Sequence, residues 1–149
     1  MNREILFKAK RKDNGKWVEG YLFDDGMPKP KRYFIGGIII KPYEGTACDK
    51  WNVVGIDFCE IDIDTLCQYT ELTDKNGRKI WENDICNRKE KYPEIVTYNK
   101  GDWQLDYSYV FGKEMHTDAC NLGFYVCERN CVEVIGNIFD NAELLEVKR

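Results

Sequence analysis

Short apolar stretches separated by turn-forming residues constrain the fold of this chain more than any other feature, most clearly between residues 65 and 85. Asp74–Gly77 separates the first two stretches, and Glu82–Asp84 separates the second from the third. Asn and Gly accept the backbone angles that a tight turn between antiparallel strands requires. The segment is therefore predicted to form a strand, a turn, a second strand, a second turn and a third strand.

The same pattern of strands and turns extends along most of the chain. Asp13–Lys16 and Asn99–Asp102 have the composition of hairpin turns, and apolar residues alternate with polar ones in Trp17–Phe23 and Trp103–Tyr109. Turn signals recur about every ten residues, which is typical of barrels and sandwiches. Helical periodicity is almost absent, so we predict a mainly β fold with at most short helical turns.

Four further segments have expected conformations that bear on the fold. Residues 111–121 are expected to form a loop. Ile61–Asp64 is expected to form a strand, because apolar and acidic residues alternate there. Asn141 is a candidate N-cap for a single helical turn. Gly36–Gly37 predicts either a β-bulge or a close approach between two backbones.

A change in composition near Asp64 divides the chain into two predicted lobes. Residues 1–64 are expected to form an N-terminal lobe rich in β-hairpins, packed on a C-terminal β lobe of residues 65–149. The formal net charge is −4, which argues against a dedicated nucleic-acid coat protein. The charge is uneven, however, because residues 1–32 carry nine basic and five acidic side chains.

The apolar segments and the cysteines predict a cytoplasmic protein. No apolar run approaches the ~20 residues of a membrane-spanning helix, and no signal-peptide core follows the N-terminus. Seven cysteines are an odd number, so at least one of them has no partner within the chain. In a reducing compartment we expect all of them to be small, mostly buried hydrophobic residues or unreactive thiols.

Two groups of residues have some of the character of metal sites. A zinc ion could be bound by His116, Cys120, Cys127 and Cys131. Their spacings have three intervening residues instead of the two of a zinc knuckle, so scattered thiols are the favoured interpretation and no cofactor is predicted. Glu60, Asp62 and Asp64 would share one face of a strand, and we interpret them as the solvent side of a strand with Ile61 and Ile63 inward.

A basic patch with aromatic neighbours lies near the N-terminus. It consists of Lys8, Lys10, Arg11, Lys12 and Lys16, with Phe7, Trp17 and Tyr21 nearby. Such a mixture can hold single-stranded nucleic acid through phosphate contacts and base stacking. The favoured interpretation is a solvated sheet edge over core aromatics, because the charge of the whole chain is negative.

Three segments taken together resemble the YopX family of phage and prophage proteins. They are residues 3–9, 68–85 and 134–145, in the order in which the family has them. The family usually has glycine at the positions of Glu71 and Asn83. Because Asn tolerates left-handed backbone geometry, the turn at Asn83 should persist, whereas Glu71 leaves the local conformation undetermined by the sequence.

The resemblance implies that the C-terminal lobe is a small β-barrel of the SH3-like type. In such a barrel Gly77 supplies a hairpin turn, Trp81 and Ile85 fill the interior, and Gly136 marks a bend. The family has no established biochemical activity, so the resemblance brings no catalytic residue. No nucleophile–base pair stands out in the sequence either, and no enzymatic activity is predicted.

Two functions are open on this basis. The first is a phage- or prophage-encoded, non-catalytic protein-interaction module that acts on an unknown protein partner in the cytoplasm of the bacterial host, since small barrels often serve as binding platforms. The alternative is a nucleic-acid-binding small barrel that uses the basic N-terminal strand pair. Exposed strand edges and many aromatic residues also favour self-association into a homo-oligomer.

Overall fold

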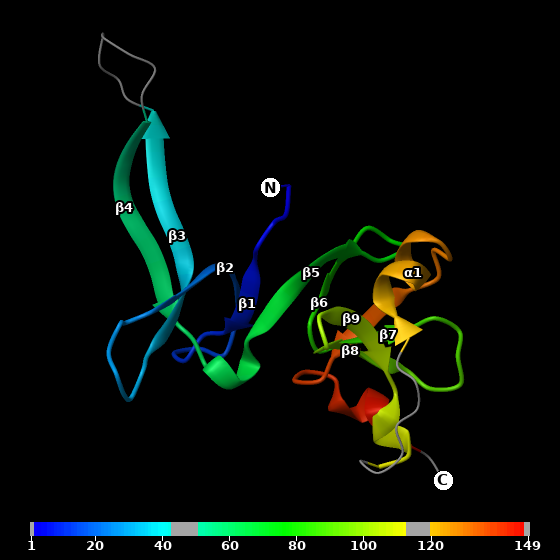
Figure 1. Ribbon diagram of the computed structural model, residues 1–149. Helices are drawn as coiled ribbons and strands as arrows, with labels where there is room; N and C mark the ends of the chain where they lie inside the picture. The colour runs from blue at the N-terminus through cyan, green and yellow to red at the C-terminus, as the bar shows by residue number, and fades with distance from the viewer. Residues whose placement is uncertain (1, 43–50, 113–119, 148–149) are drawn as a thin grey trace. The chain divides into compact units, whose positions relative to one another are not determined.

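The computed structural model describes residues 2–42, 51–112 and 120–147 of the chain (Figure 1). The chain forms two compact units. One unit, the N-terminal unit, is Ile5–Leu66, and the C-terminal unit combines Met1–Glu4 with Cys67–Arg149. Antiparallel strands dominate both, which confirms the prediction of a mainly β fold.

The N-terminal unit is an antiparallel meander in the order β4-β3-β2-β1. Its strands are β1 (Phe7–Lys10), β2 (Trp17–Asp24), β3 (Tyr33–Pro42) and β4 (Trp51–Glu60). β3 and β4 form a long antiparallel pair, drawn in cyan and green in Figure 1. The turn predicted before Trp17 joins β1 to β2, and the left-handed residue in it is Gly15, with φ of 69°.

A small apolar core fills one side of this meander. Ala9, Ile35 and Ile61 are fully or almost fully buried. The side chains packed against them are Phe7, Val18, Leu22, Tyr33 and Leu66. Apolar burial of this kind contributes about 25 cal/mol per Å², so the meander depends on these few residues for its stability.

The strand predicted for Ile61–Asp64 is wrong beyond Ile61. Ile63–Thr65 forms a 3₁₀-helix, because the Asp62 side chain accepts a hydrogen bond from the backbone of Asp64 at 3.1 Å. Such a local side-chain bond competes with strand pairing. Ile63 is consequently exposed and not inward-facing as predicted.

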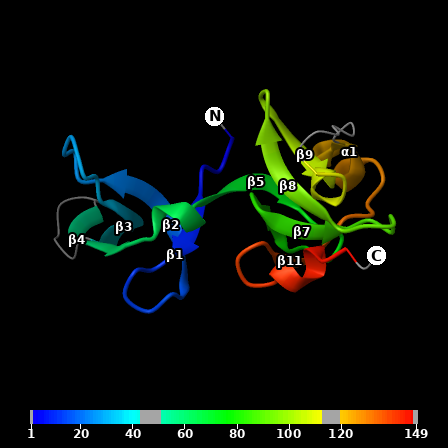
Figure 2. The same ribbon diagram turned by 90° about the horizontal axis from the view of Figure 1, so that it is seen from below.

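The C-terminal unit combines a hairpin with a sheet of five strands in the order β10-β9-β8-β7-β11 (Figure 2). The hairpin consists of β5 (Cys67–Thr73) and β6 (Lys79–Trp81). The sheet contains β7 (Asp84–Asn87), β8 (Glu94–Asn99), β9 (Asp102–Asp106), β10 (Cys120–Asn121) and β11 (Glu133–Asn137). The predicted succession of strand, turn, strand, turn and strand is therefore present as β5, β6 and β7.

Apolar side chains from most of these strands form the core of the C-terminal unit. The buried members of one cluster are Ile80, Cys86, Val96, Leu105, Leu122, Val132 and Val134. Trp81 and Ile85 are buried as expected. The register of β11 against β7 shifts between Val134 and Gly136, so the bend predicted at Gly136 is a β-bulge. An SH3-like closure of these strands stays a prediction.

Two segments of the C-terminal unit differ from their predicted conformations. A short helix, α1 (Leu122–Cys127), follows β10, whereas no helix was predicted in this region. The Asn121 side chain caps α1 by accepting a hydrogen bond from the backbone of Phe124 at 2.7 Å. β9 ends at Asp106 and not at Tyr109, because Ser108–Val110 turns into a 3₁₀-helix.

Asn141 lies at the expected start of a helical turn but does not cap it. The turn is the 3₁₀-helix Ala142–Leu145, and no hydrogen bond from it reaches the Asn141 side chain. That side chain instead accepts a hydrogen bond from the backbone of Asn137 at 3.2 Å. Asn141 therefore fixes the chain that leaves β11 and not the helix that follows.

Glu71 and Asn83, which stand where the resemblance described above implies glycine, both have left-handed backbone angles, with φ of 68° and 67°. A side chain at such an angle costs about 1–2 kcal/mol. We expect Glu71→Gly to be about 1 kcal/mol more stable than Glu71→Ala, since both variants lose the carboxylate but only alanine keeps the strain. Urea denaturation of the two variants measures this difference.

The same pair of substitutions at Lys79 is the control for the Glu71 prediction. Lys79 is an exposed residue of β6 and is not among the residues with positive φ. In an extended strand glycine is the less stable choice by about 0.5–1 kcal/mol, so the order of the two variants should reverse. An equal preference for glycine at both positions would contradict the assignment of strain to Glu71.

Candidate functional sites

The N-terminal unit exposes large apolar side chains on one face of the sheet formed by β2, β3 and β4. Phe23 lies opposite Phe34 in the register, and Ile38 lies opposite Ile56, so each pair projects from the same face. The rings of Phe34 and Phe58 meet edge to face, 5.3 Å apart. We call this surface the apolar face, and its residues are Tyr21, Phe23, Phe34, Ile38, Ile56 and Phe58.

The large apolar side chains of the apolar face are unusually exposed to solvent. Tyr21 and Ile56 are each 61% exposed, and Phe58 is 52% exposed. Strand alternation explains the arrangement, because the neighbouring residues Leu22 and Ile35 point to the opposite face and into the core. The sheet of the N-terminal unit is therefore apolar on both faces, although the core described above covers only one of them.

Charged residues lie at one end of the apolar face. Arg32 donates to Glu60 at 2.8 Å, and Lys12 donates to the same carboxylate at 3.2 Å. Hydrogen bonds from Arg32 and Lys12 lower the pKa of Glu60 to about 2, so it is ionised at any physiological pH. The Arg32 guanidinium also lies 5.3 Å from the Phe34 ring, which connects the charged end to the aromatic surface.

The structure places the five predicted basic residues on β1 and in the turn that follows it. Lys8 and Lys10 both lie over the Trp17 ring, at 4.7 and 5.4 Å from its centre. Arg11 donates two hydrogen bonds to Asp13, at 2.9 and 2.6 Å. The charges of Arg11 and Lys12 are thus paired with carboxylates within the unit.

Lys16 is the remaining member of the predicted patch. It ends the hairpin turn, where its backbone donates to the Asn14 side chain at 2.9 Å. The patch therefore has Lys8 and Lys10 beside an aromatic ring and Lys16 at the end of the turn. It is not a broad basic surface, because acidic partners are interspersed with the cations.

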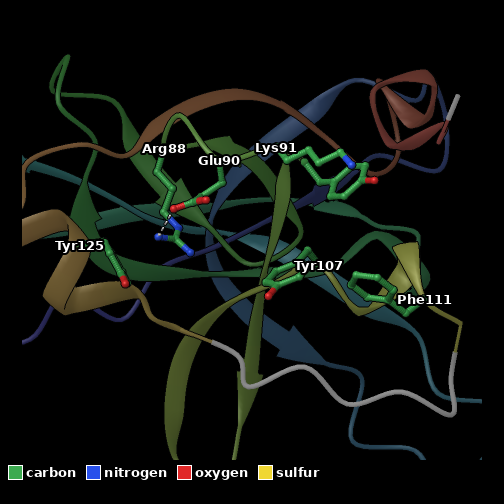
Figure 3. A pocket seen from close by; sticks show the side chains of 7 residues that line it. Arg88, Glu90, Lys91, Tyr107, Phe111 and Tyr125 are labelled. Carbon is green, nitrogen blue, oxygen red and sulfur yellow. Dashed lines mark hydrogen bonds and ion pairs between the residues drawn. The ribbon is translucent and has the colours of Figure 1, made fainter.

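The C-terminal unit contains a pocket of about 400 Å³ with mostly aromatic walls (Figure 3). We call it the tyrosine pocket. Its lining residues are Arg88, Glu90, Lys91, Tyr92, Tyr107, Phe111 and Tyr125. They come from the connection between β7 and β8, from the segment after β9, and from α1. Pockets of about 300–1,000 Å³ with such walls are typical of small-molecule sites.

A buried ion pair adjoins the tyrosine pocket. Arg88 Nε donates to Glu94 Oε1, and the two side chains are only 10% and 1% exposed. The other carboxylate oxygen of Glu94 has no hydrogen-bond partner in the described parts of the chain. Burial raises the pKa of Glu94 and outweighs the opposing effect of Arg88. The Tyr125 ring covers the Arg88 guanidinium, with its centre 4.1 Å from Cζ.

The remaining nitrogens of Arg88 have weaker partners. Nη1 donates to Glu90 Oε1 at 3.3 Å, and the Glu90 side chain is 58% exposed. Nη2 donates to the Cys120 sulfur, also at 3.3 Å. An ion pair with an exposed carboxylate is weakened by solvent, and a thiol sulfur is a weak acceptor. The guanidinium is therefore firmly held on one side and loosely held on the other.

The two groups that were considered as metal ligands have different outcomes. His116 lies outside the described residues, so the zinc hypothesis for the set with Cys120, Cys127 and Cys131 is not tested. In the described part of the chain no cluster of three or more metal-binding side chains occurs. Glu60 is instead engaged by Arg32 and Lys12, and Asp62 by the backbone of Asp64.

Neither the apolar face nor the tyrosine pocket was predicted from the sequence. The apolar face had a usable signal, because Phe34 and Ile38 alternate with the core residue Ile35 along β3. The tyrosine pocket had no such sequence signal, because three separate segments meet there only in the folded chain.

None of the helices within the described ranges has the length and apolar character to cross a membrane.

Comparisons with known proteins identify a matching family model and a solved structure with a similar fold. The family model described as YopX protein matches residues 6–146, nearly the whole chain. The crystal structure of protein EF1440 from Enterococcus faecalis is similar, with a TM-score of 0.55 and 20% identity, covering 96% of this chain and 99% of that one. A search of curated proteins finds no match. At this identity the structural similarity indicates a shared fold.

Proposed function

The chain belongs to the YopX family, and we propose that it is a non-catalytic protein-interaction module that binds a protein partner through the apolar face. The exposure of Tyr21, Ile56 and Phe58 is the observation that carries this proposal. Soluble proteins rarely leave a contiguous apolar patch of more than a few hundred Å² in water. An apolar centre with charged residues at its edge is typical of a protein-binding surface.

The size of the apolar face fits such a role. Its exposed members are three aromatic and two aliphatic side chains, namely Tyr21, Phe23, Phe58, Ile38 and Ile56. Since a large aromatic side chain has about 150–250 Å² of surface, the five together present on the order of 500 Å². A stable complex buries about 800 Å² on each partner, which the face and its charged rim can supply together.

The charges near the face favour a protein over a nucleic acid as the partner. Arg11 and Lys12 are already paired with Asp13 and Glu60. Strong binding to a phosphate backbone depends on several cations that are available to replace condensed counterions. The aromatic and aliphatic composition of the face also lacks a paired nucleophile and base, which supports a binding role over a catalytic one.

The proposal is tested by site-specific photo-crosslinking in cells that naturally produce the protein. A photoreactive residue replaces Tyr21 in one variant and Ile56 in another, and crosslinked proteins are identified by mass spectrometry. We expect the same protein to be captured from both positions. Adding Phe58→Asp should reduce the yield at least about thirtyfold, since losing a central anchor costs about 2 kcal/mol or more.

A photoreactive residue at Lys100 is the control for random contacts. Lys100 lies in the turn between β8 and β9 of the C-terminal unit and is exposed. Equal capture of the same protein from Lys100, or capture from Tyr21 that is insensitive to Phe58→Asp, would contradict the proposal. Circular dichroism of the Phe58→Asp variant shows whether the sheet remains folded.

The nucleic-acid alternative has one specific observation in its favour, the contact of Lys8 and Lys10 with the Trp17 ring. Cations beside an aromatic ring are a common arrangement in single-strand binding. Filter binding with a single-stranded DNA of mixed sequence at several salt concentrations separates the two functions. Salt-sensitive retention that disappears in a Trp17→Ala variant would favour the alternative.

A further inference from the structure

We propose that the tyrosine pocket binds a free nucleoside monophosphate, with the phosphate at the loosely held side of Arg88 and the base against Tyr107 and Phe111. The site lies in the C-terminal unit, so it goes beyond the protein-interaction function and does not depend on it. The volume of about 400 Å³ suits a ligand of this size. Four aromatic side chains, Tyr92, Tyr107, Phe111 and Tyr125, contribute to its walls.

The fixed side of Arg88 prepares the phosphate site. The buried Glu94 carboxylate accepts from Nε, and the Tyr125 ring lies against the plane of the guanidinium. Burying this ion pair has a large desolvation cost, which the fold accepts without gaining a second hydrogen bond for Glu94. The result is a guanidinium whose orientation is set before any ligand arrives, and such preorganisation strengthens binding.

The loosely held side of Arg88 is where an anion can bind. Glu90 holds Nη1 with an exposed ion pair, which is worth about 0–1 kcal/mol. Cys120 holds Nη2 through sulfur, a weak acceptor. Phosphate oxygens form shorter and stronger bonds to a guanidinium and accept from both of its outer nitrogens at once. A phosphate therefore competes with Glu90 for the same nitrogen.

The charge around the pocket favours a phosphate over a carboxylate. Lys91 supplies a second positive charge among the lining residues, with its amine 5.1 Å from the Tyr92 ring centre. A phosphate monoester carries about −1.5 to −2 charges near pH 7, so it matches two cations better than a carboxylate does. Once Glu90 is displaced, Arg88 offers hydrogen bonds to the phosphate while Glu94 still opposes its charge, and Lys91 supplies the additional positive charge.

The aromatic walls provide a place for a flat ring. The Tyr107 and Phe111 rings lie 6.1 Å apart at an angle of 65° and form a corner. Figure 3 shows Arg88 and Glu90 on the Tyr125 side of the opening, whereas Phe111 lies away from them. A ligand that carries its phosphate and its ring at opposite ends fits this arrangement. Stacking a base on an aromatic side chain is worth about 1–3 kcal/mol.

Isothermal titration calorimetry of the full chain with adenosine monophosphate, adenosine and inorganic phosphate tests the proposal. We expect the nucleotide to bind at least tenfold more tightly than either fragment. Phe111→Ala should weaken binding of the nucleotide at least fivefold, consistent with the loss of one stacking contact. Glu90→Gln should tighten it about threefold, because the competing carboxylate is removed.

Glu128→Gln is the matched control for Glu90→Gln. It removes the same charge from an exposed residue at the end of α1, which is not among the residues that line the pocket. Glu90→Gln that tightens binding no more than Glu128→Gln would overturn the proposed competition. Equal affinity for the nucleotide and inorganic phosphate would overturn the nucleotide assignment. A six-residue oligoadenylate that binds more tightly than the mononucleotide would overturn the free nucleotide as ligand.

Discussion

Replacing Asp74 by asparagine is expected to destabilise the C-terminal unit by about 3 kcal/mol, since a buried and fully hydrogen-bonded charge is lost. Asp74 is only 5% exposed. One carboxylate oxygen accepts from the backbones of Asn76 and Arg78, both at 2.9 Å, and the other accepts from Val134 at 2.9 Å. An asparagine side chain has an NH₂ group in place of one carboxylate oxygen. That NH₂ group cannot accept a hydrogen bond from a backbone N–H, so at least one backbone donor would be left unpaired.

Asp74 joins two distant parts of the unit, which explains the size of this expected effect. The turn between β5 and β6 contains Asn76 and Arg78, whereas Val134 belongs to β11. Urea denaturation monitored by tryptophan fluorescence measures the loss. The same substitution at Asp13, an exposed residue paired with Arg11, should cost far less, because solvent screens such a pair. Similar costs at the two positions would contradict the structural role of Asp74.

The ionisation of Asp74 also gives the stability a pH dependence. Burial opposes ionisation, but the hydrogen bonds from Val134, Arg78 and Asn76 outweigh it, so the pKa of Asp74 is lowered. A carboxyl group with a lowered pKa in the folded state stabilises the fold above its unfolded pKa of about 3.9. This stabilisation disappears as the pH falls through the folded pKa. The stability difference between the native protein and Asp74→Asn should therefore shrink below about pH 4.

Local turn chemistry explains why much of the β architecture could be predicted. The turn before β6 needs a left-handed residue, and Gly77 has φ of 82° there. Apolar residues such as Trp81 and Ile85 are buried because the strands between such turns have one face toward the core. These features depend on residues that are close together in the sequence, so the sequence alone indicates them.

The elements that were missed depend on local hydrogen bonds or on tertiary packing. α1 has six residues, which is too short for a helical period to be recognised, and it is positioned by the Asn121 cap and the burial of Leu122. In the same way, the Asp62 side chain bonds the backbone of Asp64 and ends the strand predicted there. An alternation of apolar and polar residues predicts which way side chains point only where the segment stays paired as a strand.

The candidate sites were less predictable than the fold, because their partners are distant in the sequence. Lys12 was identified as a cation that could bind phosphate, but its partner Glu60 lies 48 residues away. Arg88 and Tyr125 are likewise brought together only by the sheet order and α1. A sequence shows which side chains carry charge or rings, whereas the fold decides which charges are already paired.

Replacing Gly36 by alanine is expected to destabilise the N-terminal unit by about 3 kcal/mol, the upper part of the range for forced overpacking. A Cβ atom at Gly36 would lie 1.9 Å from the carbonyl oxygen of Asp57 and 2.5 Å from the Cα of Phe58. Both are backbone atoms of the paired strand β4, so no side-chain rotation relieves the clash. The close approach predicted for the Gly36–Gly37 pair is thus present at Gly36.

Gly37 provides a control at the adjacent position. A Cβ atom there would meet only the Tyr21 ring at 3.9 Å, which is an ordinary contact. Gly37→Ala should therefore change the stability by less than about 1 kcal/mol, since restriction of the unfolded chain offsets part of any cost. Hydrogen exchange of β3 and β4 in each variant, measured by mass spectrometry, reports on this unit separately from the C-terminal unit.

The Gly36 variant also connects the backbone to the apolar face. Gly36 lies between Tyr21 and Phe58 in the register, so the close approach of β3 to β4 determines how these two side chains are presented. If β4 moves away to accept a methyl group, partner binding at Phe58 should weaken in Gly36→Ala and not in Gly37→Ala. Faster exchange in both variants alike would show that the glycine pair acts through flexibility and not through the contact at Gly36.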